Sequence, residues 1–124
     1  MNLELIVNLL IAIIALLHVY IVVLEMFLWE KPAGLRAFRN SPEKAAATRV
    51  LAANQGLYNG FLAAGLFWGL WLGDAGLHFK VFFLLCIAIA GVYGALTAAR
   101  KIIFIQTVPA VIALALLALT RVSS

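Results

Sequence analysis

Four long apolar segments constrain the fold of this chain more than any other feature of its sequence. They run over residues 5–28, 51–72, 81–99 and 102–120. Each is close to the length of about 20 residues that an α-helix needs to cross a bilayer, and each is too continuous for a buried strand. Because 66% of all residues are hydrophobic and 11% are charged, the composition also differs from that of a soluble domain. The sequence therefore predicts an all-α integral membrane protein.

The length of the chain limits its organisation. With 124 residues there is room for four membrane helices and little else. We expect one antiparallel four-helix transmembrane bundle over residues 1–124. The expected helices cover about residues 4–29, 42–73, 79–100 and 103–121.

Two helix starts can be argued from local patterns. Ser41, Pro42 and Glu43 are typical of an N-cap, a first helical position and a first turn, so the second helix is expected to begin near Pro42. Pro109 lies in the first turns of the last helix. It either marks the true start, with Thr107 as the cap, or introduces a kink.

The basic residues indicate an orientation. In a four-helix arrangement, the first loop and the turn between the last two helices share one side of the membrane. That side holds seven of the nine basic residues, namely Lys31, Arg36, Arg39, Lys44, Arg49, Arg100 and Lys101. The positive-inside rule then places both connections in the cytoplasm and both termini outside. We expect a multi-pass protein of the cytoplasmic (inner) membrane.

The second helix is polar within its apolar stretch. At 100° per residue, Asn54, Gln55, Tyr58 and Asn59 form one continuous arc. Three glycines at four-residue spacing, Gly65, Gly69 and Gly73, follow on the same face and allow another helix to approach. Gly56 and Gly60 form a second face of small residues, which suits a third helix or another subunit.

The other helices carry polar groups at a similar depth. His18 and Glu25 are seven residues apart on one stripe of the first helix. Tyr93 and Thr97 share a face of the third helix, and Gln106 follows the start of the fourth. Measured from the cytoplasmic ends, these groups lie roughly 4 to 16 Å deep, with His18 the deepest. This coincidence predicts a polar cavity that opens toward the cytoplasm.

Simpler interpretations stand beside this one. Glu25 is near enough to the interface to pair with a basic residue of the first loop. The amides can serve as interhelical hydrogen bonds worth about 0.6 kcal/mol each. Glu4 and Asn8 are expected at the outer interface, and His78, next to Lys80, in a solvated outer loop.

Several strings resemble one family of small membrane proteins. They are HVYIVVLEMFLW from residue 18, LAANQGLYNGFLAAGL from residue 51, AGVYGALTAARK from residue 90 and QTVPA from residue 106. They resemble the four-helix bacterial proteins grouped as domain of unknown function 1304. The resemblance implies the fold and topology rather than an activity. Its motifs single out His18, Glu25, Trp29, Asn54, Gln55, Tyr58, Asn59, Tyr93 and Gln106.

Three functions remain open. The first is binding of a small amphipathic molecule or a proton in the cytoplasmic-half cavity, with membrane lipids around the bundle. The second is an intramembrane enzyme in which His18 or Glu25 acts as general acid or base on a lipid-soluble substrate. The third is a structural subunit of a homo-oligomer or a larger membrane complex, docked through the glycine faces.

Other ligands are not expected. His18 has no second histidine in the membrane, so the sequence offers no metal or heme site, and the cofactor is left open. The basic residues lie at the membrane face, so nucleic acid has no physical route to the protein.

Overall fold

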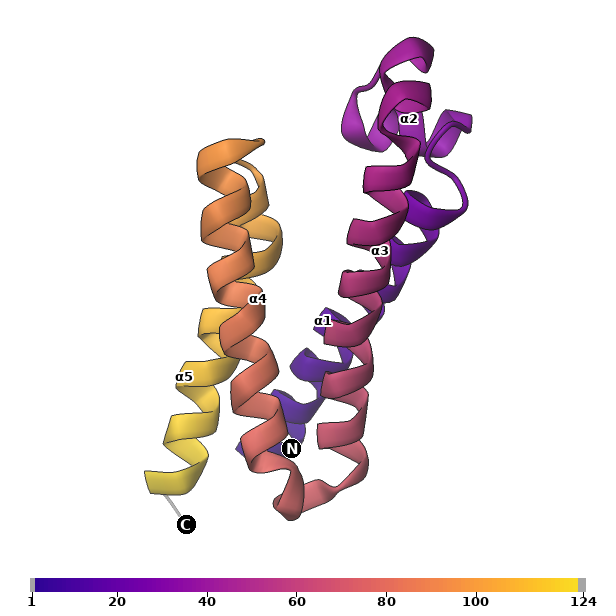
Figure 1. Cartoon of the computed structure of the whole chain (residues 1–124). Helices are drawn as coiled ribbons and strands as arrows, with labels where there is room; N and C mark the ends of the chain where they lie inside the picture. The colour runs from indigo at the N-terminus through magenta and orange to yellow at the C-terminus, as the bar shows by residue number, and fades with distance from the viewer. Residues whose placement is uncertain (1, 123–124) are drawn as a thin grey trace. The chain divides into compact units, whose positions relative to one another are not determined.

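The computed structural model describes residues 2–122, and the regular structure of these residues is helical throughout (Figure 1). The elements are α1 (Leu3–Met26), α2 (Pro32–Phe38), α3 (Pro42–Trp71), the 3₁₀ helix η1 (Gly73–Gly76), α4 (Leu77–Thr97), the π-helical turn η2 (Ile103–Thr107) and α5 (Val108–Val122). Three segments are long and apolar enough to cross a membrane, namely Leu3–Met26, Gly73–Thr97 and Ile103–Val122. An all-helical chain with membrane-compatible helices is therefore confirmed.

The helix α3 differs from these three segments in composition. It has 30 residues and is about 45 Å long, which exceeds the thickness of a hydrocarbon core. Its first turns carry charged side chains, and the amides of Asn54, Gln55 and Asn59 make its later turns less apolar than α1 or α4.

The chain divides into two compact units. The first unit contains Met1–Ala15 and Ala64–Ser124, and the second contains Leu16–Ala63. The first unit therefore holds the beginning of α1, the end of α3 and all of α4 and α5. The second unit holds the remainder of α1 and α3, together with α2.

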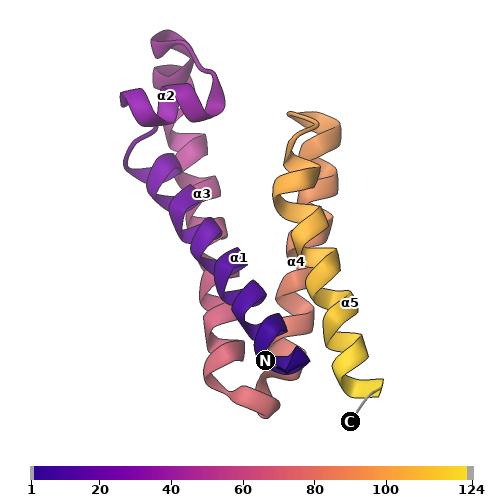
Figure 2. The same cartoon turned by 180° about the vertical axis from the view of Figure 1, so that it is seen from behind.

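In the second unit, α1 and α3 lie side by side, and α2 covers one end (Figure 2). Two glycines of α3 face α1. A Cβ atom on Gly56 would lie 3.1 Å from the Cβ of Glu25, and one on Gly60 would lie 3.7 Å from a methyl group of Val22. The face of Gly56 and Gly60, which was open to a third helix or another subunit in the sequence, is thus covered by a helix of the same chain.

The connection between α1 and α3 contains a short helix, where an irregular loop was expected. Pro32 occupies the first turn of α2, and Arg39 ends it with a left-handed φ of 54°. The rings of Trp29 and Phe38 pack with their centroids 4.8 Å apart. Gly34 is buried so closely against the carbonyl group of Leu28 that a side chain there would collide with backbone.

The start of α3 follows the predicted capping pattern. The helix begins at Pro42, and the backbone N–H of Lys44 donates a hydrogen bond of 3.1 Å to the hydroxyl oxygen of Ser41. Proline at the first helical position has no N–H to leave unpaired, and the serine satisfies one of the remaining donors. The prediction of a helix start near Pro42 is confirmed.

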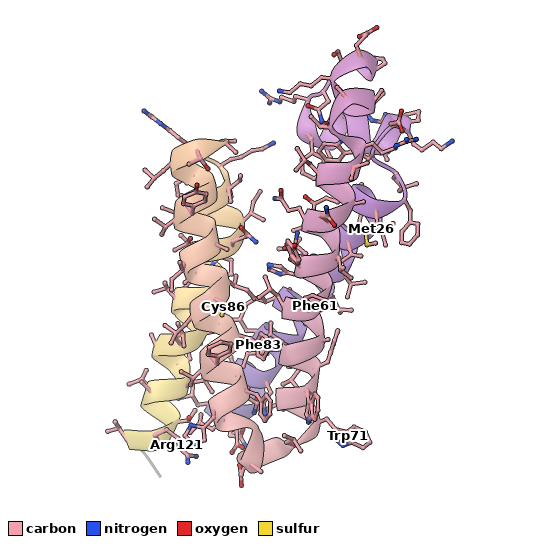
Figure 3. All side chains as sticks on the ribbon, in the orientation of Figure 1. Met26, Phe61, Trp71, Phe83, Cys86 and Arg121 are labelled. Carbon is pink, nitrogen blue, oxygen red and sulfur yellow. The ribbon has the colours of Figure 1, made fainter. Side chains whose placement is uncertain are left out.

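In the first unit, α4 and α5 lie side by side, and α4 runs back along the end of α3 (Figure 1). Gly65 packs against the ring of Phe83, which is labelled in Figure 3. Gly69 packs against Lys80, and Gly76 packs against the backbone of Gly69. Gly65 and Gly69 therefore allow the close approach that their spacing predicts. Gly73 does not, because it has a φ of 61° in the turn and nothing within 4 Å of a would-be Cβ.

A π-helical turn precedes Pro109. The backbone N–H of Val108 reaches back five residues to the carbonyl of Ile103. A proline ring clashes with the carbonyl four residues before it in an α-helix, and a wider turn relieves that clash. One interpretation of the sequence made Thr107 the cap of this helix, and the structure shows a different role. Its hydroxyl donates instead to the carbonyl oxygen of Ala88 on α4, at 2.9 Å.

The contact of Gly34 predicts a mutational effect. Gly34→Ala would place a methyl group against the backbone of Leu28 and force α2 away from the end of α1. We expect a loss of roughly 1–3 kcal/mol, as for other overpacked sites. Thermal unfolding in detergent, followed by circular dichroism, measures it.

Gly60→Ala is the matched control, because its methyl group would make an ordinary contact with Val22. It should be neutral or stabilising, since alanine favours a helix interior. Equal stability of the two variants would contradict the close approach of α2 to α1.

Candidate functional site

The second unit contains a buried carboxylate and amide in direct contact. The side-chain N–H of Asn59 on α3 donates a hydrogen bond of 2.6 Å to a carboxylate oxygen of Glu25 on α1. Both residues are almost fully buried, since 4% of the Glu25 surface and 8% of the Asn59 surface are exposed. Gly56 lies one turn before Asn59 and lets α1 approach at Glu25. Gly56 and Asn59 are three positions apart on α3, and together they place a hydrogen-bond donor opposite the carboxylate of Glu25.

This contact rules out one simpler interpretation of Glu25. Within residues 2–122, Glu25 forms no ion pair with a basic residue of the first loop, and its hydrogen-bond partner is the amide of Asn59. The ion pair near that loop joins Glu30 and Arg49 instead, at 3.8 Å, and both side chains are largely exposed. A shallow open hollow of about 320 Å³ lies beside this pair, lined also by Met26, Phe27, Trp29 and Lys31.

His18 lies two turns before Glu25 on α1 and is completely buried. Between them lies Val22, which faces Gly60 of α3. The buried stripe of α1 in this unit therefore includes both ionisable residues that the sequence singled out.

The remaining polar residues of α3 have a different environment. Asn54, Gln55 and Tyr58 are exposed, and 59% of the Tyr58 surface is accessible. The Tyr58 ring packs beside Phe61 of the same helix, at 6.2 Å between centroids. Of the predicted arc, Asn59 is the residue that the second unit places against Glu25.

The other predicted site residues belong to the first unit. Tyr93 is 69% exposed, and the hydroxyl of Thr97 donates to the carbonyl oxygen of Tyr93 within α4. Gln106 is half-buried in the π-helical turn, next to Thr107. A site shared by all nine residues remains a prediction.

The structure adds a polar pair that the sequence analysis missed. Lys80, expected beside the outer loop at the start of the helix 79–100, lies in α4 and is 5% exposed. Its ammonium group donates a hydrogen bond of 3.0 Å to the side-chain oxygen of Asn8 on α1. A signal was present in the sequence: Gly69 precedes the turn at the spacing needed for α3 to pack on Lys80, whose stem it contacts.

Further charged residues surround this pair at one end of the first unit. A cleft of about 180 Å³ is lined by Glu4 and Asn8 of α1, Asp74 of η1, Lys80 of α4, and Thr120 and Arg121 of α5. Figure 3 shows Arg121 at the end of α5. Within residues 2–122, no group of three histidine, cysteine, aspartate or glutamate side chains is arranged to hold a metal ion.

These features define a class of protein: an all-helical chain with membrane-length helices and buried polar pairs between helices. Residues 12–118 match the family described as "Protein of unknown function (DUF1304)", and the chain belongs to this family. It is 33% identical over 104 residues to the protein called "Uncharacterized protein YpaA" of Lactococcus lactis subsp. lactis (strain IL1403), covering 82% of this chain and 87% of that protein. No solved structure matches the chain.

The Glu25 contact predicts a measurable coupling. Asn59→Ala leaves the buried carboxylate without its donor, so it should destabilise the protein more than Asn54→Ala, which removes an exposed amide. In a double-mutant cycle with Glu25→Ala, we expect a coupling of roughly 0.6–2 kcal/mol, as for other interhelical hydrogen bonds in membranes. Unfolding of the four proteins in detergent provides the values. A coupling of zero would show that the two residues act independently.

Proposed function

We propose that this protein is a multi-pass protein of the bacterial cytoplasmic membrane that binds the polar group of a small amphipathic molecule, or a proton, at Glu25. The observation that carries the proposal is the hydrogen bond of 2.6 Å between the buried side chains of Glu25 and Asn59. Ionisable groups in membrane helices are rare and mark ligand or proton sites by default.

The packing at the end of α3 supports a fourth membrane helix. Gly65 and Gly69 lie against Phe83 and Lys80, so the end of α3 runs antiparallel to the start of α4. If α4 crosses the membrane, the last turns of α3 lie within the same layer. Because α3 continues without a break to Pro42, it has the length to cross as well.

The charge distribution supports the same topology. Four spans place the basic connection before α3 on the same side as Arg100 and Lys101. Three spans would put these two groups on opposite sides, against the positive-inside rule. The four-span arrangement therefore has both termini outside. Trp71, which projects from the end of α3 with 87% of its surface exposed (Figure 3), suits the outer headgroup layer.

The chemistry of the Glu25 contact favours binding. A carboxylate accepts at two oxygens, and Asn59 is its hydrogen-bond partner in the described part of the chain. A buried charge is costly unless it is paired. A proton, or a donor group such as an ammonium at the head of an alkyl chain, supplies what the amide alone does not.

Binding accounts for this contact better than catalysis does. A general acid or base must lie within hydrogen-bond reach of the proton that it transfers, whereas the buried carboxylate of Glu25 is engaged by the amide of Asn59. An amide orients a polar ligand without taking up or releasing a proton. The scaffold alternative has no specific contact in its favour, because the glycines of α3 that lie within the helix already contact other helices of the same chain, namely Gly56, Gly60, Gly65 and Gly69.

Cysteine labelling tests the topology. In a Cys86→Ser background, single cysteines replace Ser41, Ala75 and Lys101, and intact spheroplasts are treated with a membrane-impermeant maleimide. Four spans predict that Ala75→Cys is labelled from outside, while Ser41→Cys and Lys101→Cys react only after lysis. Labelling of Ala75→Cys from the same side as Ser41→Cys would show that α3 does not cross.

A charge-neutral variant tests binding. Wild-type protein in nanodiscs is titrated with dodecylammonium, and the NMR signal of the Asn59 side-chain amide is followed. We expect a saturable shift that weakens about tenfold or more in Glu25→Gln, the effect of losing a charged hydrogen-bond partner. Glutamine keeps the acceptor for Asn59, so the contact between helices is preserved.

Two controls make the result specific. Glu30→Gln removes an exposed acid near the same end of α1 and should bind dodecylammonium like the wild type. Infrared spectra detect a protonated carboxylic acid. If the ligand is a proton, the wild type shows this band for Glu25 and Glu25→Gln lacks it. Equal dodecylammonium binding by Glu25→Gln, with no carboxylic-acid band lost, would refute the proposal.

A further inference from the structure

The cleft around Lys80 in the first unit is separate from Glu25 and has the chemistry of a second binding site. It has a volume of about 180 Å³ and is formed by three helices and the turn before α4. Six of its lining residues are polar, and they include two acids and two bases, namely Glu4, Asn8, Asp74, Lys80, Thr120 and Arg121.

Lys80 provides a positive charge in the cleft. Only 5% of the residue is exposed, and its ammonium group is hydrogen-bonded to Asn8. In the part of the chain that the structure describes, its hydrogen-bond acceptor is this neutral amide rather than a carboxylate. An ammonium has three donors, so Lys80 can also donate to a ligand anion. Arg121, which lines the same cleft, adds a second positive charge.

Glu4 and Asp74 provide negative charge beside the lysine. Both are exposed, and both act electrostatically on the Lys80 ammonium. They come from different elements, the first turn of α1 and the 3₁₀ helix η1. The cleft therefore presents positive and negative groups to the same small volume, which suits a ligand that carries both charges.

The position of the cleft indicates where such a ligand comes from. Its residues lie in the first turns of α1 and α4 and the last turns of α5, which are the ends of the three membrane-length segments. The ends of such helices lie at the level of the lipid headgroups. Pockets between membrane helices that carry basic side chains at this level are among the known binding sites of lipid headgroups.

We propose that this cleft binds a phosphoethanolamine group, with its phosphate at Lys80 and Arg121 and its ammonium at Glu4 and Asp74. Lysine and arginine form charge-assisted hydrogen bonds to phosphate oxygens. The two carboxylates accept hydrogen bonds from a primary ammonium, which the quaternary ammonium of a choline headgroup cannot donate. The same group occurs in phosphatidylethanolamine and in free O-phosphoethanolamine.

Lipid retention tests the site in the full-length protein. Membranes containing equal amounts of phosphatidylethanolamine, phosphatidylcholine and phosphatidylglycerol are solubilised, and the lipids that stay with the purified protein are counted by native mass spectrometry. We expect wild type to retain phosphatidylethanolamine about tenfold over the other two lipids. Lys80→Gln should lose this retention, and Glu4→Gln with Asp74→Asn should lose the preference over phosphatidylcholine.

Matched variants separate binding from folding. Lys80→Arg keeps the charge and should keep the retention. Lys101→Gln and Glu43→Gln remove exposed charges elsewhere in the chain and should behave like wild type. In nanodiscs of phosphatidylcholine alone, ³¹P NMR follows added O-phosphoethanolamine. A shift that depends on Lys80 would assign the site to the free compound, whereas lipid retention without a shift assigns it to the headgroup.

Two results would overturn the inference. One is retention of phosphatidylethanolamine by Lys80→Gln at the wild-type level, together with no Lys80-dependent ³¹P shift. The other is a wild-type preference for phosphatidylglycerol that the acid substitutions leave unchanged, because that pattern requires an anion alone.

Discussion

A polar group in a membrane helix must find its partner on a neighbouring helix, and the rest of this structure depends on that constraint. Water is absent from the hydrocarbon core, so an unpaired carboxylate or ammonium there is costly. Small residues allow two helices to approach closely. Gly56 allows this approach beside Glu25 and Asn59 in the second unit, and Gly69 allows it beside Lys80 in the first.

The two polar pairs differ in what they offer a ligand. Glu25 and Asn59 are both nearly inaccessible to solvent, and the hydrogen-bond partner of the Glu25 carboxylate is a neutral amide rather than a basic group. Lys80 and Asn8 lie at a cleft with four further polar residues. The first pair suits a single donor or a proton, whereas the second suits a group with charges of both signs. A chain of 124 residues thus places a buried acid in one unit and a buried base in the other.

Much of this arrangement follows from the sequence, and the exceptions have physical causes. Apolar length and capping residues predict the helices and the start of α3 at Pro42, because these depend on neighbours in the chain. The cost of polar groups in lipid is what singled out Glu25 and Asn59 in the sequence, and the structure places the two in contact. The helix α2 was missed because it is short and its residues pack on the turn before it, as Phe38 does on Trp29. The burial of Lys80 was missed because a charged side chain next to a loop is expected to be exposed, whereas Asn8 and Gly69 accommodate it inside.

The π-helical turn before Pro109 sets the angular position of the residues in α5. A π turn holds one residue more than an α-helical turn, so everything after it is rotated by about 100° relative to a continuous α-helix. Only Ile102 and the turn of residues 98–101 lie between α4 and η2, so the π turn sets the helical phase of α5 from its start. Removing one residue from Ile103–Thr107 would rotate the residues of α5 and carry Thr120 and Arg121 away from the side that lines the cleft. In this sense the turn sets the angular register that brings the end of α5 to the Lys80 cleft.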